Sequence, residues 1–237
     1  MKILITGAHF TTAIAVIEEL KKKEVELIYI GRRTTQEGDS SQSVESAVLP
    51  KLGVKFIPII AGRLQRSFSP YTIPSLLKIP IGFFQALNII FTQKPKVVLS
   101  FGGYVAAPVV ISAWMMGIPI IIHEQTLVTG LANQISSWFA KKIAISFDSQ
   151  HTFNKKKVVL TGNPLRQEIL DPDKNLSTDF KRIFETAKEE KLPVILITGG
   201  NQGSHVINEA VEECLDELLK ISCAIHQTGD SKFKDFE

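Results

Sequence analysis

Three glycine-containing turns directly follow short apolar runs in this chain. They lie at Gly7, at Gly102-Gly103 and at Gly199-Gly200-Asn201-Gln202-Gly203. An apolar run followed by a glycine turn and a helical pattern is typical of a parallel strand that leads into a helix, and ligands bind where such strands end. Backbone N–H groups at the start of the helix suit a phosphate. For Gly7 alone a simple tight turn is the favoured interpretation, whereas the third turn favours contact with a phosphate or a sugar.

The glycine spacing disfavours two common nucleotide-binding classes. None of the turns matches the dinucleotide pattern G-x-G-x-x-G, and Arg32-Arg33 follow the second apolar run, where an NAD enzyme needs an acidic residue. The phosphate-loop pattern G-x-x-x-x-G-K-[ST] is also absent from the sequence. A Rossmann oxidoreductase and a P-loop NTPase are therefore poor hypotheses.

Polar side chains end two further apolar runs. His123-Glu124-Gln125 follow residues 118–122, and Gly162-Asn163-Pro164-Leu165-Arg166 follow a later run. Polar groups at the mouth of a buried strand are costly without partners, and an arginine suits bidentate contact with phosphate. His9, in the first turn, titrates near neutral pH as a general base should. The alternatives are a structural helix cap for Glu124 and an ordinary turn histidine for His9.

Taken together, these motifs resemble the MurG family of bacterial glycosyltransferases. The resemblance extends from Met1 to about Gly229 and keeps the family's order of motifs. The residues that carry it are Gly102-Gly103-Tyr104-Val105-Ala106-Ala107-Pro108, His123-Glu124-Gln125, Gly130-Leu131-Ala132-Asn133, Gly162-Asn163-Pro164-Leu165-Arg166 and Gly199-Gly200-Asn201-Gln202-Gly203-Ser204.

The resemblance implies an α/β fold of the GT-B type, with two Rossmann-like, doubly wound parallel sheets. Residues 1–163 would form the domain that takes the lipid acceptor, and residues 164–237 part of the domain that takes the UDP-sugar. The implied reaction moves N-acetylglucosamine (GlcNAc) from UDP-GlcNAc to undecaprenyl-pyrophosphoryl-MurNAc-pentapeptide, with inversion, in peptidoglycan synthesis. Neither a metal nor a cofactor belongs to the family's chemistry.

The resemblance also implies roles for individual residues. It makes His9 the base that deprotonates the acceptor hydroxyl and places Glu124 beside it as a second catalytic residue. Helix N-termini and Arg166 would stabilise the leaving diphosphate. The residues expected to contact substrate are Gly7, Gly102, Gly103, Tyr104, Gln125, Thr126, Asn133, Arg166, Gly199, Gly200, Asn201, Gln202 and Gly203.

Three positions depart from the family pattern. The family's first glycine loop is longer than Gly7-Ala8-His9, so diphosphate contact at this loop is in question. Thr126 stands where the family has an asparagine, which changes the available hydrogen bonds. Asn201 stands where the family's third loop has a serine.

The elements that must position these residues follow from apolar periodicity. Strands are expected at residues 2–6, 25–30, 54–60, 97–100, 118–123, 142–146 and 158–161, with helices at 12–23, 71–93, 106–116 and 131–139 and a surface loop at 34–46. A second strand–helix–strand unit, with strands at 193–198 and 222–227 and a helix at 204–219, starts near residue 192. These two strands either extend the first sheet or begin a second domain that is cut short. The new glycine loop favours the second, and we expect this chain to be inactive alone.

Charge is distributed unevenly along the chain. Residues 1–163 hold 18 basic and 9 acidic residues, whereas residues 164–237 hold 9 and 15. A basic first part suits phosphates or an anionic membrane surface. No nucleic-acid partner is expected. Two cysteines that fit no metal spacing, Cys214 and Cys223, indicate a reducing compartment.

Two apolar segments bear on the membrane. Residues 97–122 carry no charge and are long enough to span a bilayer, but their glycines and Pro108 and Pro119 predict strand, helix and strand instead. Residues 71–93 combine an apolar helical face, including Phe83, Phe84 and Phe91, with flanking Arg63, Arg66, Lys78 and Lys94. This helix could pack on the sheet or, together with Trp114, contact an anionic bilayer. We expect a peripheral protein at the cytoplasmic face of the plasma membrane.

A second function remains open from the sequence. The chain could be a non-catalytic, lipid-acceptor or scaffold subunit of a two-chain UDP-GlcNAc transferase. The short first loop favours this alternative, and the donor-type loop at Gly199–Gly203 argues against it.

Overall fold

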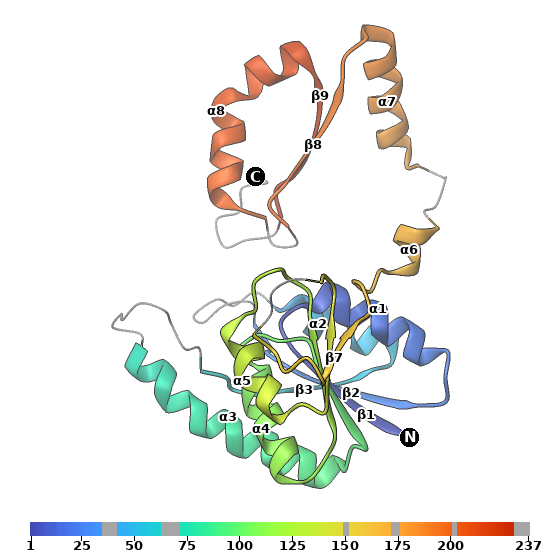
Figure 1. The fold of residues 1–237 in the computed structure, drawn as a ribbon. Helices are drawn as coiled ribbons and strands as arrows, with labels where there is room; N and C mark the ends of the chain where they lie inside the picture. Colours follow the sequence, from blue (N-terminus) through green and yellow to red (C-terminus); the bar gives the residue numbers. More distant parts are fainter. Residues whose placement is uncertain (35–41, 63–71, 149–151, 172–175, 201–202, 230–237) are drawn as a thin grey trace. The chain divides into compact units, whose positions relative to one another are not determined.

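The computed structural model describes residues 1–34, 42–62, 72–148, 152–171, 176–200 and 203–229, with backbone only for 72–77 (Figure 1). Its contacts divide the chain into two compact units, Met1–Leu170 and Asp171–Glu237. The sequence places a functional boundary after residue 163, and that assignment stays a prediction. Each unit is described by itself below.

The first unit is a seven-stranded sheet in the order β3-β2-β1-β4-β5-β6-β7, and every pair of neighbouring strands is parallel. Parallel strands covered on both faces bury side chains of both orientations, which is why β1, β2 and β5 are nearly continuous apolar runs. The doubly wound sheet expected from the sequence is confirmed. The strands are β1 (Lys2–Thr6), β2 (Glu26–Gly31), β3 (Lys55–Pro58), β4 (Val97–Ser100), β5 (Ile120–Glu124), β6 (Lys142–Ile145) and β7 (Val158–Leu160).

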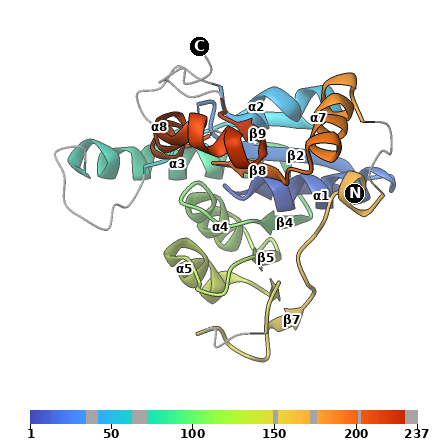
Figure 2. The same ribbon diagram turned by 90° about the horizontal axis from the view of Figure 1, so that it is seen from above.

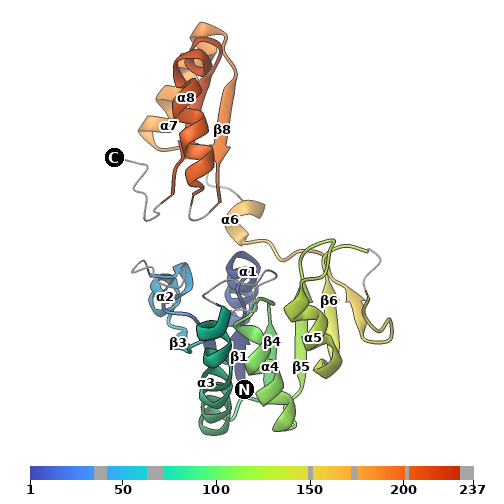
Figure 3. The same cartoon turned by 90° about the vertical axis from the view of Figure 1, so that its left-hand side faces the viewer.

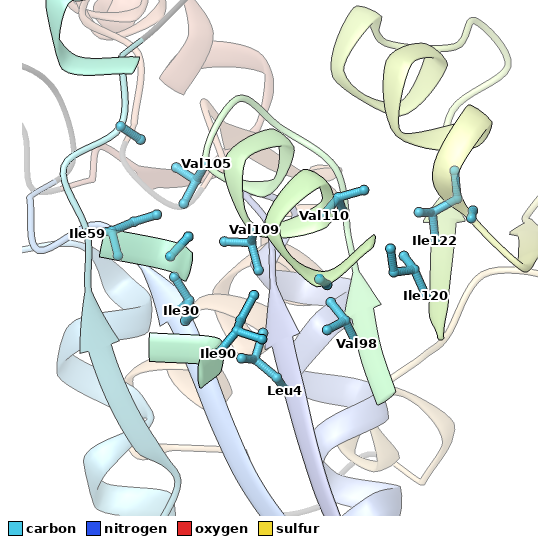
Figure 4. Close-up of a cluster of buried hydrophobic side chains, with 14 of the residues drawn as sticks. Leu4, Ile30, Ile59, Ile90, Val98, Val105, Val109, Val110, Ile120 and Ile122 are labelled. Atoms are coloured by element: carbon cyan, nitrogen blue, oxygen red, sulfur yellow. The ribbon is translucent and has the colours of Figure 1, made fainter. Parts of the chain in front are cut away.

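Helices cover both faces of this sheet. Alternate residues of β1 point to opposite faces: Ile3 and Ile5 pack with α1, whereas Leu4 packs with α3 and α4. Figure 4 shows the second of these clusters, in which Ile90 and Val109 meet the strands. The helices are α1 (Phe10–Lys21), α2 (Val44–Val48), the 3-10 turn η1 (Pro50–Leu52), α3 (Thr72–Gln93), α4 (Ala106–Met115), α5 (Leu131–Phe139) and α6 (Gln167–Leu170).

Helices α3, α4 and α5 lie side by side across one face of the sheet (Figures 2 and 3). The uncharged segment 97–122 is confirmed as β4, α4 and β5. No helix in the described ranges is both long and apolar enough to cross a membrane. Residues 35–41 of the expected surface loop at 34–46 lie outside the described residues. The end of this expected loop is wrong, because α2 begins at Val44, with the Ser43 hydroxyl accepting a hydrogen bond from Ser46 N at 3.2 Å.

The second unit contains a parallel strand pair in a strand–helix–strand arrangement, as the sequence predicts. Strand β8 (Val194–Thr198) pairs with β9 (Cys223–Gln227). Helix α7 (Thr178–Glu190) precedes β8, and α8 (His205–Ile221) connects the two strands. Within the described residues these strands pair with each other and not with the seven-stranded sheet, so the alternative in which they extend the first sheet is wrong.

Candidate functional site

The strand order of the first unit reverses at β1, which lies between β2 and β4. Chain connections leave a doubly wound sheet in opposite directions at such a point, and the crevice beyond the carboxyl ends of the strands is the usual ligand site. Gly7 follows β1 and Gly102 follows β4, so two of the predicted glycine turns meet there. The Ala8 amide donates to the Gly102 carbonyl at 2.9 Å and joins the two turns.

Both turns need glycine because the chains approach too closely for a side chain. Gly7 has φ +143°, and a Cβ atom there would lie 2.7 Å from the carbonyl carbon of Phe101. Gly103 has φ +81°, and its Cβ would lie 2.4 Å from the Cβ of Ala8. The positive φ values are strained for other residues. The two turns therefore pack backbone against backbone, with no side chain between them.

A buried tyrosine supports the first turn from below. The Tyr29 hydroxyl donates to the Gly7 carbonyl at 2.7 Å, and its ring packs against Phe10 and Phe56. Burial raises the pKa of Tyr29 far above its ordinary value, so the hydroxyl keeps its proton and remains a donor. The sequence analysis missed this residue. The available signal was a single hydroxyl within an otherwise apolar strand.

Removing this hydroxyl should destabilise the first unit. The Tyr29→Phe change leaves the Gly7 carbonyl buried without its donor, which should lower the free energy of unfolding by about 1–3 kcal/mol. Urea unfolding measured by tryptophan fluorescence gives the difference. Unchanged stability would mean that the hydrogen bond does not hold the turn.

Glu124, at the end of β5, is buried and holds the following loop through four hydrogen bonds. Its Oε1 accepts from the Thr126 amide at 3.0 Å and the Thr126 hydroxyl at 2.6 Å. Its Oε2 accepts from the Gly130 amide at 3.3 Å and from Asn133 Nδ2 at 3.0 Å. Burial by itself would raise the pKa of Glu124, but these hydrogen bonds to the carboxylate outweigh it and lower the pKa. The carboxylate is thus ionised and has little capacity to take a proton.

His9 begins α1 beside this loop. The Gln125 carboxamide nitrogen lies 2.8 Å from His9 Nδ1, and the Thr12 hydroxyl lies 3.3 Å from Gln125 Oε1. Burial lowers the pKa of His9, and the nearby Glu124 only partly opposes that shift. The imidazole is therefore neutral at neutral pH, as a proton acceptor must be. The structure brings together residues of α1 and of the loop after β5, including Thr12, which the sequence analysis missed.

A second polar network joins the ends of the last three strands. Ser146 Oγ, which follows β6, lies 3.2 Å from His123 Nε2 and donates to Asn163 Oδ1 at 3.4 Å. Burial lowers the pKa of His123, with the Gly162 carbonyl and Glu124 opposing it. These contacts hold the Gly162-Asn163 turn against the sheet. Ser146 is thus the hydrogen-bond partner of the buried His123 imidazole.

These titrating groups predict acid sensitivity. Folded His9 and His123 resist protonation, whereas the unfolded chain takes up protons at the ordinary value of 6.5. The unfolded state then binds more protons, so the free energy of unfolding should fall as the pH drops below about 6.5. Glu124 adds stability above its ordinary value of 4.5, and that stability is lost as the pH falls through its lowered pKa. Burial raises the pKa of Glu45, which acts in the opposite direction nearer its ordinary value of 4.5. Urea titrations at stepped pH test the prediction, and stability that rises as the pH is first lowered below about 6.5 would contradict it.

The remaining predicted residues make other contacts. The Tyr104 ring lies 4.9 Å from the Arg32 guanidinium carbon, in a cation–π contact. Arg166 pairs with Glu168 at 3.6 Å. Asn201 and Gln202 lie outside the described residues. Among the residues that are described, no three His, Cys, Asp or Glu side chains gather in a way that could hold a metal ion.

The third glycine turn belongs to the second unit. Gly200 and Gly203 have φ +84° and +73°, and the Gly203 amide donates to the Gly200 carbonyl at 3.1 Å. A Cβ on Gly203 would lie 1.7 Å from the Thr228 carbonyl oxygen. The turn leads into the N-terminus of α8, whose N-cap residue Ser204 makes no side-chain capping bond. Uncapped N–H groups of this kind suit an anion.

Helix α3 both packs on the sheet and faces solvent. Ile90 is fully buried, but Phe84 and Phe91 on the other side of α3 are 65% and 63% exposed. The neighbouring helices add Trp114 on α4 and Trp138 on α5. Arg63 and Arg66, and the side chains of Leu76 and Leu77, lie outside the described part of the chain. We call the exposed set Ile81, Phe84, Phe91, Trp114, Met115 and Trp138 the apolar helix patch.

Sequence comparison identifies the family of the first unit. Residues 6–145 match the glycosyltransferase family 28 N-terminal domain. A relative from Clostridium kluyveri is 37% identical over 239 residues, which cover 99% of this chain and 64% of the relative. A Clostridium botulinum relative is 35% identical, again over 99% of this chain and 64% of the relative. Both are named UDP-N-acetylglucosamine–N-acetylmuramyl-(pentapeptide) pyrophosphoryl-undecaprenol N-acetylglucosamine transferase. The chain thus spans less than two thirds of these relatives.

Structural comparison agrees. The crystal structure of Acinetobacter baumannii MurG matches with a TM-score of 0.59 at 25% identity, over 98% of this chain and 61% of that one. A UDP-GlcNAc 2-epimerase from Neisseria meningitidis, bound to UDP-GlcNAc, matches with a TM-score of 0.62 at 17% identity, over 100% and 74%. The second likeness shows the fold alone. Together they confirm the predicted Rossmann-like fold class of GT-B transferases.

Proposed function

The chain belongs to glycosyltransferase family 28, and on that premise we propose that it transfers GlcNAc from UDP-GlcNAc to undecaprenyl-pyrophosphoryl-MurNAc-pentapeptide. The observation that carries the proposal is the group of side chains at the switch point of the first sheet. A histidine with a lowered pKa stands there beside two closely packed glycine turns. This combination suits an acceptor that brings both a phosphate and a hydroxyl to be activated.

The reaction needs one proton transfer. His9 takes the proton of the acceptor sugar hydroxyl, and the oxygen of that hydroxyl attacks the anomeric carbon of GlcNAc. The bond from that carbon to the UDP oxygen breaks with inversion, and UDP leaves with the bonding electrons. Glu124, whose lone pairs accept four hydrogen bonds, holds the loop rather than carrying the proton. Its place among the catalytic residues stays a prediction from the sequence.

The two units divide the substrates. The N-terminus of α1, which has no side-chain cap, would bind the acceptor diphosphate. The Gly199–Gly203 turn and the N-terminus of α8 would bind the diphosphate of UDP. Arg166 would add charge for the leaving group. Within this proposal the first unit serves the acceptor and the second the donor, and the chemistry requires no metal.

Transfer of radiolabelled GlcNAc to a lipid-linked muramoyl-pentapeptide tests the proposal. It is measured for this chain and for the chain joined to the C-terminal segment of the Clostridium kluyveri relative that lies beyond the matched region. We expect transfer by the joined protein. Binding of both substrates without transfer would overturn the catalytic proposal and favour the acceptor-binding subunit instead.

We also propose that the apolar helix patch contacts an anionic membrane at its cytoplasmic face, where the lipid acceptor is anchored. Phe84 and Phe91 on α3 and Trp138 on α5 are largely exposed, and α4 packs against both of these helices. Lys94, next to the end of α3, is also exposed. Exposed aromatic side chains beside basic ones are typical of proteins that lie on anionic bilayers.

Replacing both phenylalanines should weaken membrane binding. The double change Phe84→Ser and Phe91→Ser should lower affinity for phosphatidylcholine–phosphatidylglycerol vesicles about 30- to 1,000-fold, since each inserted ring contributes roughly 1–2 kcal/mol. Co-sedimentation with the vesicles measures this. Ile169→Ser, at an exposed apolar residue of α6, is the matched control and should bind normally. Equal loss in the control, or none in the double variant, would contradict the patch.

A further inference from the structure

We propose that Gln125 is a positioning residue that presents its carboxamide oxygen to His9 Nδ1 and thereby sets which imidazole nitrogen carries the proton. The consequence for catalysis rests on the proposed transferase function, but the protonation pattern itself does not. The argument follows from the number of protons available to Thr12, Gln125 and His9.

The Thr12 hydroxyl has one proton and two nearby acceptors. It lies 2.9 Å from the His9 carbonyl oxygen, one helical turn back, and 3.3 Å from Gln125 Oε1. A threonine in the first turn of a helix commonly donates to the carbonyl three or four residues before it. Because the shorter contact is to the His9 carbonyl, that carbonyl takes the proton. The Thr12 oxygen then has only lone pairs to offer Gln125.

A lone pair on Thr12 determines which end of the carboxamide faces it. With Oε1 toward Thr12, two oxygens would face each other with no proton between them. Turning the carboxamide end for end exchanges its oxygen and nitrogen at nearly the same positions. Its nitrogen then donates to the Thr12 oxygen, and its oxygen accepts a proton from His9 Nδ1 across the 2.8 Å contact. Each of the hydrogen bonds that link the His9 carbonyl, Thr12, Gln125 and His9 Nδ1 then has one proton.

The surroundings keep this arrangement in place. Thr12 is 2% exposed, so water competes little for its lone pairs. Glu124 binds both the amide and the hydroxyl of Thr126, which pins the backbone on each side of Gln125. The carboxamide is therefore aimed at His9 by the loop that Glu124 organises. Unpaired polar groups in such a site cost more than in water.

The result is a histidine prepared for its proposed task. A proton on Nδ1 leaves the lone pair of neutral His9 on Nε2, the nitrogen that does not face Gln125. A general base must have that lone pair free toward the hydroxyl. The opposite orientation, with Gln125 donating to Nδ1, would place the proton on Nε2 and block it. Gln125 thus acts through His9 without touching the reacting atoms.

Nitrogen-15 NMR of the imidazoles tests the proposal on this chain without any substrate. Long-range proton–nitrogen spectra are recorded above pH 6.5, the ordinary histidine value, where His9 is neutral. The His9 signals are assigned by their loss in His9→Gln. We expect a protonated Nδ1 and an unprotonated Nε2. The reverse pattern would overturn the proposal, whether or not the protein transfers GlcNAc.

Variants of Gln125 test the direction of its hydrogen bond to His9. A glutamate can only accept from Nδ1, so Gln125→Glu should show the same pattern as the parent. A switch of pattern between the parent and Gln125→Glu would show that the parent carboxamide donates, which overturns the proposal. Gln125→Leu removes the acceptor. The ratio of the Nδ1-protonated to the Nε2-protonated neutral form of His9 should then fall about fivefold, as expected for the loss of one net hydrogen bond.

Thr12 supplies the matched pair. Thr12→Ser keeps the hydroxyl and should keep the parent pattern, whereas Thr12→Val leaves the carboxamide nitrogen without its acceptor and should weaken the Nδ1 preference. An unchanged pattern in Thr12→Val would remove Thr12 from the proposal. In the transfer assay, Gln125→Leu should lower kcat more than it raises KM. Parent protein that shows the expected pattern but no transfer would contradict the proposed function alone.

Discussion

Replacing His9 by alanine should lower GlcNAc transfer by about 100- to 10,000-fold, the usual contribution of a general base. The reason is that His9 is the neutral, partly buried imidazole at the switch point, with one nitrogen engaged by Gln125. Initial rates with the lipid-linked acceptor, measured on the joined protein, give the effect. The kcat should fall, while the affinity of the protein for vesicles that contain the lipid-linked acceptor should stay nearly constant.

The pH profile sharpens this prediction. Because burial lowers the pKa of His9, the acid limb of kcat/KM should lie below pH 6.5. Thr11→Ala is the control, since Thr11 is the exposed neighbour in the same helical turn. A His9→Ala protein with full activity, or an equal loss in Thr11→Ala, would remove His9 from the role of base.

The second large effect is expected at Glu124. Its replacement by alanine leaves the Thr126 and Gly130 amides without an acceptor, and Asn133 Nδ2 keeps only the His123 carbonyl. Some of these groups can turn to water, so the free energy of unfolding should fall by about 2–3 kcal/mol rather than by the full sum. Transfer should fall as well, because the loop that aims Gln125 loses its anchor. Urea unfolding and the transfer assay measure the two losses on the same preparation.

Two comparisons decide what Glu124 does. Glu19→Ala, at an exposed carboxylate of α1, should change stability by no more than about 0.5 kcal/mol. Glu124→Gln keeps one acceptor oxygen but turns an NH₂ group toward two donors, so it should also lose stability. If Glu124→Gln kept full stability and lost all transfer, Glu124 would have a chemical role and not the holding role proposed here.

Much of the first unit was predictable from local pattern. Buried parallel strands are continuous apolar runs, so β1, β4 and β5 and the helices between them lie close to the expected ranges. Two boundaries shifted. Helix α1 begins at Phe10, two residues before the expected start, and α2 begins after its Ser43 cap, where a loop was expected. The motif Gly102-Gly103 and the run His123-Glu124-Gln125 identified strand ends without any tertiary information.

The apolar helix shows where pattern alone could not decide. A helix against a sheet and a helix against a bilayer share the same composition, so residues 71–93 left both open. Packing distinguishes the two sides of α3: Ile90 is buried in the core, whereas Phe84 and Phe91 are exposed. One helix thus has a buried side and an exposed side. The direction of each side chain depends on where α4 lies, which no local pattern records.

The sequence by itself determined the order of strands and helices, the glycine turns and the family, because these depend on residues close together in the chain. Only the tertiary structure decided which strand ends meet. Gln125 lies 113 residues from Thr12, and they touch because β1 pairs with β4 and β4 with β5. Strand order is set by packing over the whole sheet. The four donors on Glu124, the Tyr29 support and the Thr12–Gln125–His9 chain therefore belong to the fold rather than to any motif.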